Sequence, residues 1–249
     1  TLAGKRVLVQ GIGHVGEVLV QHLTNEGAIV TISDINENRL HEVGSKYGAK
    51  IFSGNDLYSL DVDIYAPCAL GATINDETIS KIQAKVIAGA ANNQLANEVI
   101  HGKLLKEKGI LYAPDFLINA GGVINVYSEL ANLTSAQVME KTENIYHTAM
   151  DIFTLSDVQN ITTHQAALNI AQKSLSTALT HLTETHQETA NSYFNISGCC
   201  YVMGNFDQAL IYLDKVLQIR TQIFGEQHID TISTYYNIAI CQEKKGAIN

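Results

Sequence analysis

Apolar residues in the first half of the chain alternate between short β-branched runs and helical periods. The short runs predict strands at residues 6–10, 29–33, 50–52, 64–66, 86–89 and 110–113. Helical patterns lie between them, near residues 14–25, 36–47, 75–83, 94–108 and 119–132. Asn36 and Asn75 are predicted helix caps. Strands that alternate with helices predict right-handed βαβ units and a doubly wound parallel sheet.

The alternation ends near residue 134, and the pattern is helical from there on. Two amphipathic helices are predicted at 134–154 and 162–182. An internal repeat follows, in which seven residues recur 42 positions later. The first copies are His186, Thr189, Tyr193, Asn195, Ile196, Cys199 and Gly204, and the second are His228, Thr231, Tyr235, Asn237, Ile238, Cys241 and Gly246. A period of this length indicates stacked helical pairs. We therefore predict an α/β domain at 1–182 and a short all-α module at 183–249.

A glycine-rich turn between the first strand and the first helix carries the clearest chemistry. Gly11, Gly13 and Gly16 form a Gly-x-Gly-x-x-Gly pattern there. Gly11 allows a tight turn, Gly13 lets the backbone approach a pyrophosphate, and Gly16 lets the helix pack on the strand. Asp34 follows the second strand, 18 residues after Gly16, where a carboxylate meets the adenosine ribose of a dinucleotide. The pattern favours a Rossmann-type domain over the alternative of a glycine-rich turn beside a surface aspartate.

Four later stretches lie at strand ends, where ligands bind in a doubly wound sheet. They are residues 66–72, 89–94, 113–116 and 119–126. Small residues in the first would let a ribose approach, although an ordinary βα loop has the same pattern. Asn92 and Asn93 suit either the orientation of a carboxamide or ribose, or the capping of a helix. Asn119 and the two glycines that follow it suit either a bulky planar ligand or a helix start.

Composition and charge narrow the classes of partner. The 249-residue chain is 46% hydrophobic with a net charge of −9, which is typical of a globular protein. It shows no basic stripe, so nucleic acid and anionic membranes are disfavoured. It shows neither a membrane-length apolar run nor a signal peptide. The cysteines form no C-x-x-C pair, and we expect a reducing, cytoplasmic setting without a metal site.

The strand-end motifs together resemble those of the glutamate, leucine, phenylalanine and valine dehydrogenases, and the leucine dehydrogenases most closely. The shared stretches run in order across residues 11–126: Gly-x-Gly-His-Val-Gly, Ala-Pro-Cys-Ala-Leu-Gly-Ala, Asn-Asp-Glu-Thr-Ile, Lys-Val-Ile-Ala-Gly-x-Ala-Asn-Asn-Gln-Leu and Tyr-Ala-Pro-Asp-x-x-Ile-Asn-Ala-Gly-Gly-Val-Ile-Asn-Val. A looser likeness continues to about residue 176.

The resemblance implies the oxidative deamination of a branched-chain L-amino acid to its 2-oxo acid, with NAD as oxidant. It assigns cofactor contacts to Gly11, Gly13, His14, Val15, Gly16, Asp34, Ile35, Cys68, Ala69, Leu70, Gly71, Ala91, Asn92 and Asn119. It assigns the substrate to Asn119 and to an apolar pocket with Val123 and Val126. Asp34 favours NAD over NADP, because a carboxylate would repel the additional phosphate.

Two departures from the family limit what the resemblance implies. The family's catalytic lysines and aspartate lie in an N-terminal substrate domain, whereas this chain begins almost at the first strand. We therefore expect this chain alone to bind NAD without turnover, either as part of a longer enzyme or as a remnant. The family assembles into oligomers, which implies a homo-oligomer, but residues 183–249 stand in place of the family's usual tail.

Residues 186–246 instead resemble tetratricopeptide repeats of the kinesin-light-chain type, with one full repeat and the first helix of another. Arrays of this kind usually need about three repeats, so we expect this piece to lean on the helices at 134–182 or to continue further. His186 and His228 recur with the repeat and are predicted to be structural. The repeat resemblance implies a protein or peptide partner. The alternative function is therefore an inactive NAD-binding scaffold or sensor.

Overall fold

The computed structural model describes residues 1–54, 56–130 and 133–247, and its contacts divide the chain into two compact units. One unit consists of Thr1–Ile124 and Glu140–Ala149. The other consists of Asn125–Met139 and Met150–Asn249. The boundary expected between residues 182 and 183 follows sequence likeness, and it stays a prediction.

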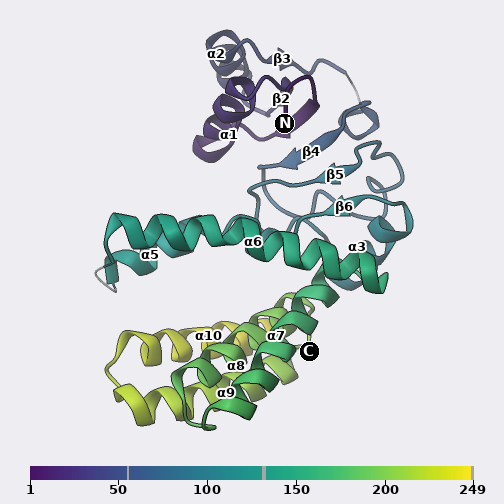
Figure 1. Cartoon of the computed structure of the whole chain (residues 1–249). Helices are drawn as coiled ribbons and strands as arrows, with labels where there is room; N and C mark the ends of the chain where they lie inside the picture. Colours follow the sequence, from purple (N-terminus) through teal and green to yellow (C-terminus); the bar gives the residue numbers. More distant parts are fainter. Residues whose placement is uncertain (55, 131–132, 248–249) are drawn as a thin grey trace. The chain divides into compact units, whose positions relative to one another are not determined.

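The first unit is built on a six-stranded parallel sheet (Figure 1). Its strands are β1 (Arg6–Gln10), β2 (Ile29–Ser33), β3 (Lys50–Ile51), β4 (Ile64–Pro67), β5 (Val86–Ile87) and β6 (Leu111–Tyr112). They lie in the order β3-β2-β1-β4-β5-β6. The strand order reverses between β1 and β4, which is the point where doubly wound sheets bind ligands. The predicted sheet is therefore confirmed.

The apolar side chains of β1 contribute to the cores on both faces of the sheet, because successive strand residues point in opposite directions. Val7 and Val9 pack with residues of α1 (His14–Asn25) and α2 (Glu37–Tyr47). Leu8 lies on the other face, in a core with Tyr65, Ile74, Ile79, Ile82, Ile87, Leu95, Leu105 and Tyr112. The side chains of Val7, Leu8 and Val9 are thus buried on both faces of the sheet, and the loop after β1 extends from a well-packed core.

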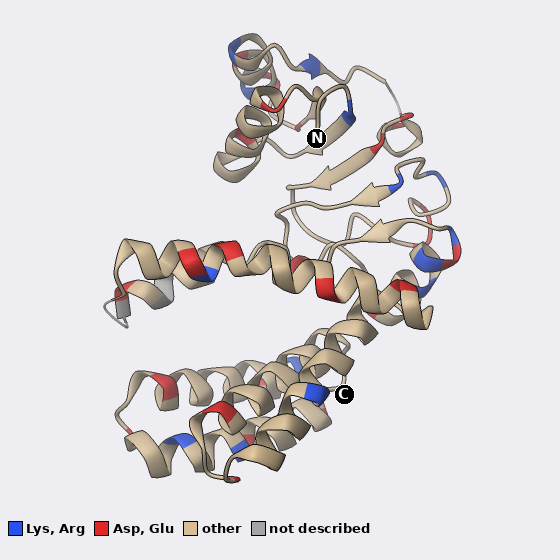
Figure 2. Ribbon diagram, in the orientation of Figure 1, with Lys and Arg blue, Asp and Glu red and all other residues tan. Residues whose placement is uncertain are grey.

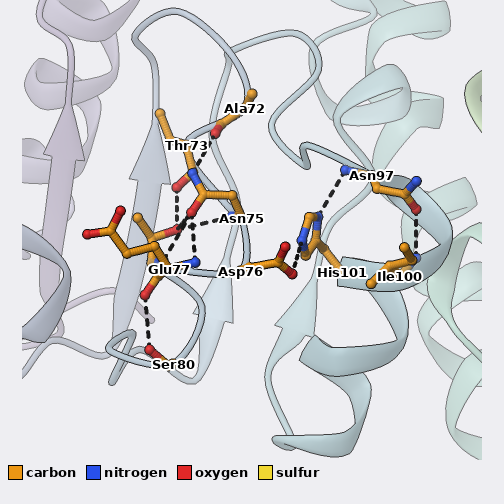
Figure 3. Close-up of polar contacts among 10 residues, drawn as sticks. Ala72, Thr73, Asn75, Asp76, Glu77, Ser80, Asn97, Ile100 and His101 are labelled. Atoms are coloured by element: carbon orange, nitrogen blue, oxygen red, sulfur yellow. Dashed lines mark hydrogen bonds and ion pairs between the residues drawn. The ribbon is translucent and has the colours of Figure 1, made fainter. Parts of the chain in front are cut away.

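The helix predicted near residues 75–83 is wrong, because side chains there compete for the backbone (Figure 3). The Asn75 Oδ1 atom accepts hydrogen bonds from the amides of Glu77 and Thr78, both at 3.1 Å. The Thr78 hydroxyl donates to the Thr73 carbonyl oxygen at 2.6 Å and accepts from the Asn75 amide at 3.0 Å. Local bonds of this kind favour turns over a helix.

Asparagine side chains determine where two helices of the first unit begin. The Asn36 side chain accepts a hydrogen bond from the Arg39 amide at 3.2 Å and caps α2, as predicted. The Asn97 side chain accepts one from the Ile100 amide at 2.8 Å. Because Asn97 is the cap, α3 (Glu98–Glu107) begins later than the helix predicted from residue 94.

The rest of the chain is helical. Its helices are α4 (Asp115–Ile118), α5 (Gly121–Leu130), α6 (Ser135–Gln159), α7 (Thr163–His181), α8 (Gln187–Val202), α9 (Phe206–Phe224) and α10 (Ile229–Gly246). The helix predicted near 119–132 corresponds to α5, whereas the short helix α4 before it was not predicted. Helices α6 and α7 confirm the next two predictions. Over the described residues, no helix combines the length and the apolar character that crossing a bilayer requires.

Helices α7 to α10 of the second unit share a continuous apolar core. Its buried members are Leu168 and Ala171 of α7, Ile196 and Cys200 of α8, Ala209 and Leu213 of α9, and Cys241 of α10. Acidic and basic residues both occur along the ribbon of these helices, without a segment of a single sign (Figure 2). The Nδ1 atoms of His186 and His228 accept hydrogen bonds from the amides two residues on, at 3.1 and 3.2 Å. Both histidines cap helices, which confirms their predicted structural role.

Candidate functional site

The glycine loop after β1 contains two glycines that the fold itself requires. Gly11 has φ +92, and a Cβ atom there would lie 2.5 Å from the Ala69 amide nitrogen. A Cβ atom at Gly16 would overlap the carbonyl oxygen of Gly11. At Gly13, by contrast, no atom lies within 4 Å of the position that a Cβ would take. Gly13 therefore leaves the N-terminus of α1 open to a ligand, beside the exposed residues His14 and Val15.

Asp34 joins the glycine loop to the start of α2. Its Oδ2 atom accepts a hydrogen bond from the Ile12 amide at 2.7 Å, and its Oδ1 atom accepts one from the Asn36 amide at 2.9 Å. Hydrogen bonds from backbone amides to a carboxylate are stronger than those between neutral groups. They hold Asp34 at the carboxyl end of β2, half-buried, while the neighbouring Ile35 side chain is fully exposed.

A charged cluster between α1 and α2 supports this loop. The two carboxylate oxygens of Glu17 accept hydrogen bonds from Lys46 Nζ at 2.9 Å and from Arg39 Nη2 at 2.6 Å. The bonds from Lys46 and Arg39 lower the pKa of Glu17 from 4.5 to about 2. Arg39 Nη2 also donates to the carbonyl oxygen of Ile12 at 3.2 Å. The guanidinium is thus held by groups of the protein.

This cluster predicts how stability responds to acid. A carboxyl group whose pKa is lower in the folded state stabilises the fold above its unfolded pKa, and the contribution is lost as the pH falls through the folded pKa. For Glu17 this window runs from about pH 4.5 down to about pH 2. In urea titrations, Glu17→Gln should be less stable than the unaltered chain at pH 6, and the difference should shrink toward pH 2. A constant difference across this range would contradict the assignment, and Glu107→Gln is the exposed control.

The loop after β4 packs against the glycine loop through small residues. The Cys68 amide donates to the carbonyl oxygen of Gln10 at 2.7 Å, which continues the parallel ladder. Burial raises the pKa of the Cys68 thiol, and the side chain packs against the core that contains Val7 and Val9. Ala69 lies against Gly11, and Leu70 follows with 93% of its side chain exposed. An apolar side chain this exposed is suited to cover a ligand.

The loops after β4 and β5 touch through their backbones. A Cβ atom at Gly71 would overlap the carbonyl oxygen of Asn92 and lie 2.5 Å from that of Asn93. The Ala72 amide donates to the Asn93 carbonyl oxygen at 2.6 Å. Ala72 and Asn93 both have left-handed backbones, with φ of 61 and 51. Residues in such strained conformations persist where surrounding contacts hold them, often at functional sites.

Asn92 and Asn119 meet at the far end of this edge. The Asn119 Nδ2 atom donates to Asn92 Oδ1 at 2.5 Å and to the Ala91 carbonyl oxygen at 3.5 Å. Neither Asn92 nor Asn93 caps a helix, because Asn97 caps α3, so that alternative is wrong. Asn119 is the C-cap of α4, so it does not cap the next helix, but the two glycines after it do begin a helix, since α5 starts at Gly121. The side chains of Val123 and Val126 lie outside the described residues.

The stretch 113–116 was expected at this edge, but the sequence did not predict the role of the carboxylate within it, which braces the edge. Asp115 is 5% exposed, and its Oδ2 and Oδ1 atoms accept hydrogen bonds from the amides of Gln94 at 3.0 Å and Phe116 at 2.8 Å. The buried Gln94 side chain donates to the carbonyl oxygens of Gly89 at 2.6 Å and Ala91 at 2.9 Å. An aspartate directly after a strand and a proline was the available indication, since acidic residues are favoured in the first helical turn.

A buried histidine was also missed, and Figure 3 shows its bonds. His101 Nδ1 accepts a hydrogen bond from the Asn97 amide at 2.9 Å. Its Nε2 atom therefore carries the proton that faces Asp76 Oδ1 at 3.1 Å. The pair ties the turn segment at 75–83 to the start of α3. The spacing of Asn97 and His101, one helical turn apart, was the available indication.

The predicted cofactor residues thus lie in one line of contacts along the carboxyl edge of the sheet. Asp34 contacts the glycine loop, the glycine loop contacts Ala69, Gly71 contacts Asn92, and Asn92 contacts Asn119. Across the described residues, no group of three or more His, Cys, Asp or Glu side chains could hold a metal ion. The parallel sheet, the glycine loop and the strand-end carboxylate define a Rossmann-type domain of the doubly wound class.

Residues 36–190, more than half of the chain, match the family model of the glutamate/leucine/phenylalanine/valine dehydrogenases. The chain therefore belongs to this family of amino-acid oxidoreductases, whose members typically use NAD or NADP. Residues 188–248 match a tetratricopeptide repeat model. The predicted family and the predicted repeat module are both confirmed.

Similar proteins agree with this assignment. The chain is 46% identical over 171 residues to an L-tryptophan dehydrogenase of Nostoc punctiforme, covering 69% of this chain and 48% of that protein. It is 47% identical over 173 residues to a leucine dehydrogenase of Thermoactinomyces intermedius, covering 70% of this chain and 47% of that protein. A crystal structure of L-tryptophan dehydrogenase from Nostoc punctiforme superposes with a TM-score of 0.67 at 45% identity, over 69% of this chain and 51% of that one. The chain thus spans about half the length of these relatives.

Proposed function

We propose that this chain is the NAD-binding part of a cytoplasmic L-amino-acid dehydrogenase. The reaction is the oxidative deamination of an L-amino acid, of the leucine or branched-chain class, to its 2-oxo acid. The observation that carries the proposal is the open helix start at Gly13, which lies at the switch point of the sheet. Two apolar side chains of the neighbouring strand-end loops, Ile35 and Leu70, are exposed.

The geometry of the edge fits NAD from end to end. The backbone at Gly13 and the N-terminus of α1 would bind the pyrophosphate. Asp34 would accept hydrogen bonds from the adenosine ribose, with Ile35 beside it. Arg39, which contacts the loop at the Ile12 carbonyl oxygen, is engaged by Glu17 at 2.6 Å, so we expect the carboxylate of Asp34 to dominate and to favour NAD over NADP. When bound, NAD supplies the hydride acceptor.

The other end of the edge would position the reacting parts. Asn92 and Asn119 are suited to orient the nicotinamide carboxamide, since their amides bond to each other at 2.5 Å and each retains further donors and acceptors. Cys68, Ala69, Leu70, Gly71 and Ala91 would line the path between the two ends. Val123 and Val126 would contact the substrate side chain. A homo-oligomer is part of the same proposal.

Saturable NAD binding without turnover is the expected result for this chain alone. The proton-transferring groups of the reaction would come from the half of the relatives that the chain does not span. Calorimetric titration with NAD should give a single site, and NADP should bind at least tenfold more weakly. Mixtures of NAD with L-leucine, L-phenylalanine or L-tryptophan should form no NADH. Absence of saturable NAD binding would overturn the proposal. Formation of NADH would overturn the expectation that this chain alone has no turnover.

The repeat match supports a second candidate, in which the NAD-binding unit acts as a scaffold or sensor for a protein partner. The two candidate functions predict different results when a substrate domain is added to this chain. If a relative's N-terminal half, supplied in trans, restores NADH formation, the enzyme function is favoured. If NAD instead changes the affinity for a captured partner while turnover stays absent, the sensor function is favoured.

A further inference from the structure

Two buried polar side chains, Gln94 and Asp115, are bonded to the segments that carry the amide pair of Asn92 and Asn119. Gln94 is fully buried and Asp115 is 5% exposed, whereas Asn92 is exposed and Asn119 is half-buried. Burying polar groups is costly unless hydrogen bonds compensate for the lost water. The groups to which the two buried side chains are bonded therefore indicate what they do.

The Gln94 side chain fixes the loop after β5. Its Nε2 atom donates to the carbonyl oxygens of Gly89 at 2.6 Å and Ala91 at 2.9 Å. The Asn119 Nδ2 atom donates to the same Ala91 carbonyl oxygen at 3.5 Å and to Asn92 Oδ1 at 2.5 Å. The Ala91 carbonyl group is thus shared by the buried amide of Gln94 and the amide of Asn119, so a shift of this carbonyl would also move Asn119.

Asp115 joins the loop at 89–94 to the segment that carries Asn119. Its Oδ2 atom accepts a hydrogen bond from the Gln94 amide at 3.0 Å, and its backbone carbonyl oxygen accepts one from the Asn119 amide at 3.1 Å. Its Oδ1 atom accepts one from the Phe116 amide at 2.8 Å, which fixes the carboxylate at the start of α4. One residue therefore holds Asn119 through a helical turn and the 89–94 loop through its carboxylate.

The backbone beside Asn92 needs such support. The next residue, Asn93, has a left-handed backbone with φ of 51. This conformation is strained for a residue other than glycine, and it persists only where surrounding contacts hold it. The amide that follows Asn93 is that of Gln94, which the Asp115 carboxylate binds. Without this bond, we expect Asn93 to relax and to move Asn92 away from Asn119.

We propose that Asp115 and Gln94 are positioning residues for the nicotinamide end of the cofactor. Both are buried, so they act through Asn92 and Asn119, whose amides they hold in one geometry. Supporting bonds of this kind keep a binding group in its productive position. The inference rests on the proposed NAD-binding function. It adds that affinity for the nicotinamide ring depends on Asp115 and Gln94, whereas affinity for the ADP-ribose part does not.

A comparison of NADH with ADP-ribose separates these two contributions, because ADP-ribose lacks the nicotinamide ring. Fluorescence titration measures the affinity for NADH, and calorimetry measures that for ADP-ribose. The unaltered chain should prefer NADH by about fivefold, the effect of about one hydrogen bond. In Asp115→Asn this preference should fall to about twofold, because the new amide can accept only one of the two backbone bonds. Affinity for ADP-ribose should stay the same.

Gln94→Met is a second test, because methionine has a similar length but cannot donate to the two carbonyl oxygens. It should lower the preference for NADH in the same way. Asp76→Asn is the matched control for the aspartate, since it makes the same replacement in the same unit and weakens the bond to the buried His101 (Figure 3). Gln83→Met is the control for the glutamine, since Gln83 is exposed and donates to the Lys81 carbonyl oxygen. Both controls should keep the full preference.

A double variant tests whether Asp115 acts through Asn119. Asn119→Ala should by itself lower the preference for NADH to about twofold, the value expected for Asp115→Asn. If Asp115 acts by positioning Asn119, the two replacements together should give the same value as either one, because coupled residues have non-additive effects. Independent effects would instead abolish the preference in the double variant.

The results distinguish failure of this inference from failure of the proposed function. If neither NADH nor ADP-ribose binds the unaltered chain, the proposed function fails. If both bind but the unaltered chain does not prefer NADH, or if Asp115→Asn and Gln94→Met keep the preference, the positioning role is overturned. It is also overturned if Asp76→Asn loses the preference, or if both test variants lose ADP-ribose binding, since their role is then structural.

Discussion

Replacing Gly13 with valine is expected to reduce NAD affinity at least a hundredfold while the fold is retained. The structure has open space around the position of a Cβ atom at Gly13, so a side chain there meets the cofactor and not the protein. Stability should fall by only about 1 kcal/mol, since glycine is a moderately good N-cap and valine a poor one. Calorimetric titration with NAD and a urea unfolding curve measure the two effects.

Two other glycine variants make this result interpretable. Gly198→Val also adds a side chain in open space, but in α8, and it should leave NAD affinity unchanged. Gly16→Val should unfold the first unit, because its Cβ overlaps the Gly11 carbonyl oxygen. If Gly13→Val bound NAD as tightly as the unaltered chain, the pyrophosphate would not lie at the start of α1.

Ala171→Asp is expected to unfold the helical stack from α7 through α10. Ala171 is 9% exposed in the core that it shares with Ile196 and Cys200. An unpaired charge buried there should destabilise the stack by about 3–5 kcal/mol. Hydrogen exchange should show loss of amide protection in α8, α9 and α10, because covering helices in such arrays stabilise their neighbours.

The neighbouring residue provides the control for this prediction. Gln172 is exposed on α7, and Gln172→Asp adds the same charge with an expected effect within about 0.5 kcal/mol. Equal protection in the two variants would mean that α8 to α10 fold without α7. Loss of protection confined to Ala171→Asp would place the start of the stack at α7, before the boundary predicted after residue 182.

Most strands of the sheet could be predicted because each is encoded by a short run of neighbouring residues. Five-residue apolar runs predict β1 and β2 with the observed bounds, Arg6–Gln10 and Ile29–Ser33. The glycine loop and Asp34 could be found for the same reason, since their spacing follows from one strand, one turn and one helix. The 42-residue repeat was visible because each copy keeps the same caps, His186 and His228.

Predictions failed where distant residues decide the local conformation. The pattern at 75–83 is compatible with a helix, but Asn75 and Thr78 bond to the nearby backbone, and Lys108, far along the chain, donates to the Ile79 carbonyl oxygen at 2.7 Å. Asp115 has no sequence pattern that reveals its bond to the Gln94 amide. Such bonds form only after two strands have brought their loops together.

The sequence by itself determined the order of the six strands along the chain, the glycine loop after the first of them, and the period of the helical stack. These properties follow from local propensity and from the repeat spacing of side chains. Only the tertiary structure decided that Gly71 lies against Asn92, that Asn92 bonds to Asn119, and that α7 covers α8. Each of these contacts joins residues far apart in the chain, and its stability comes from burial and hydrogen bonding that no single segment contains.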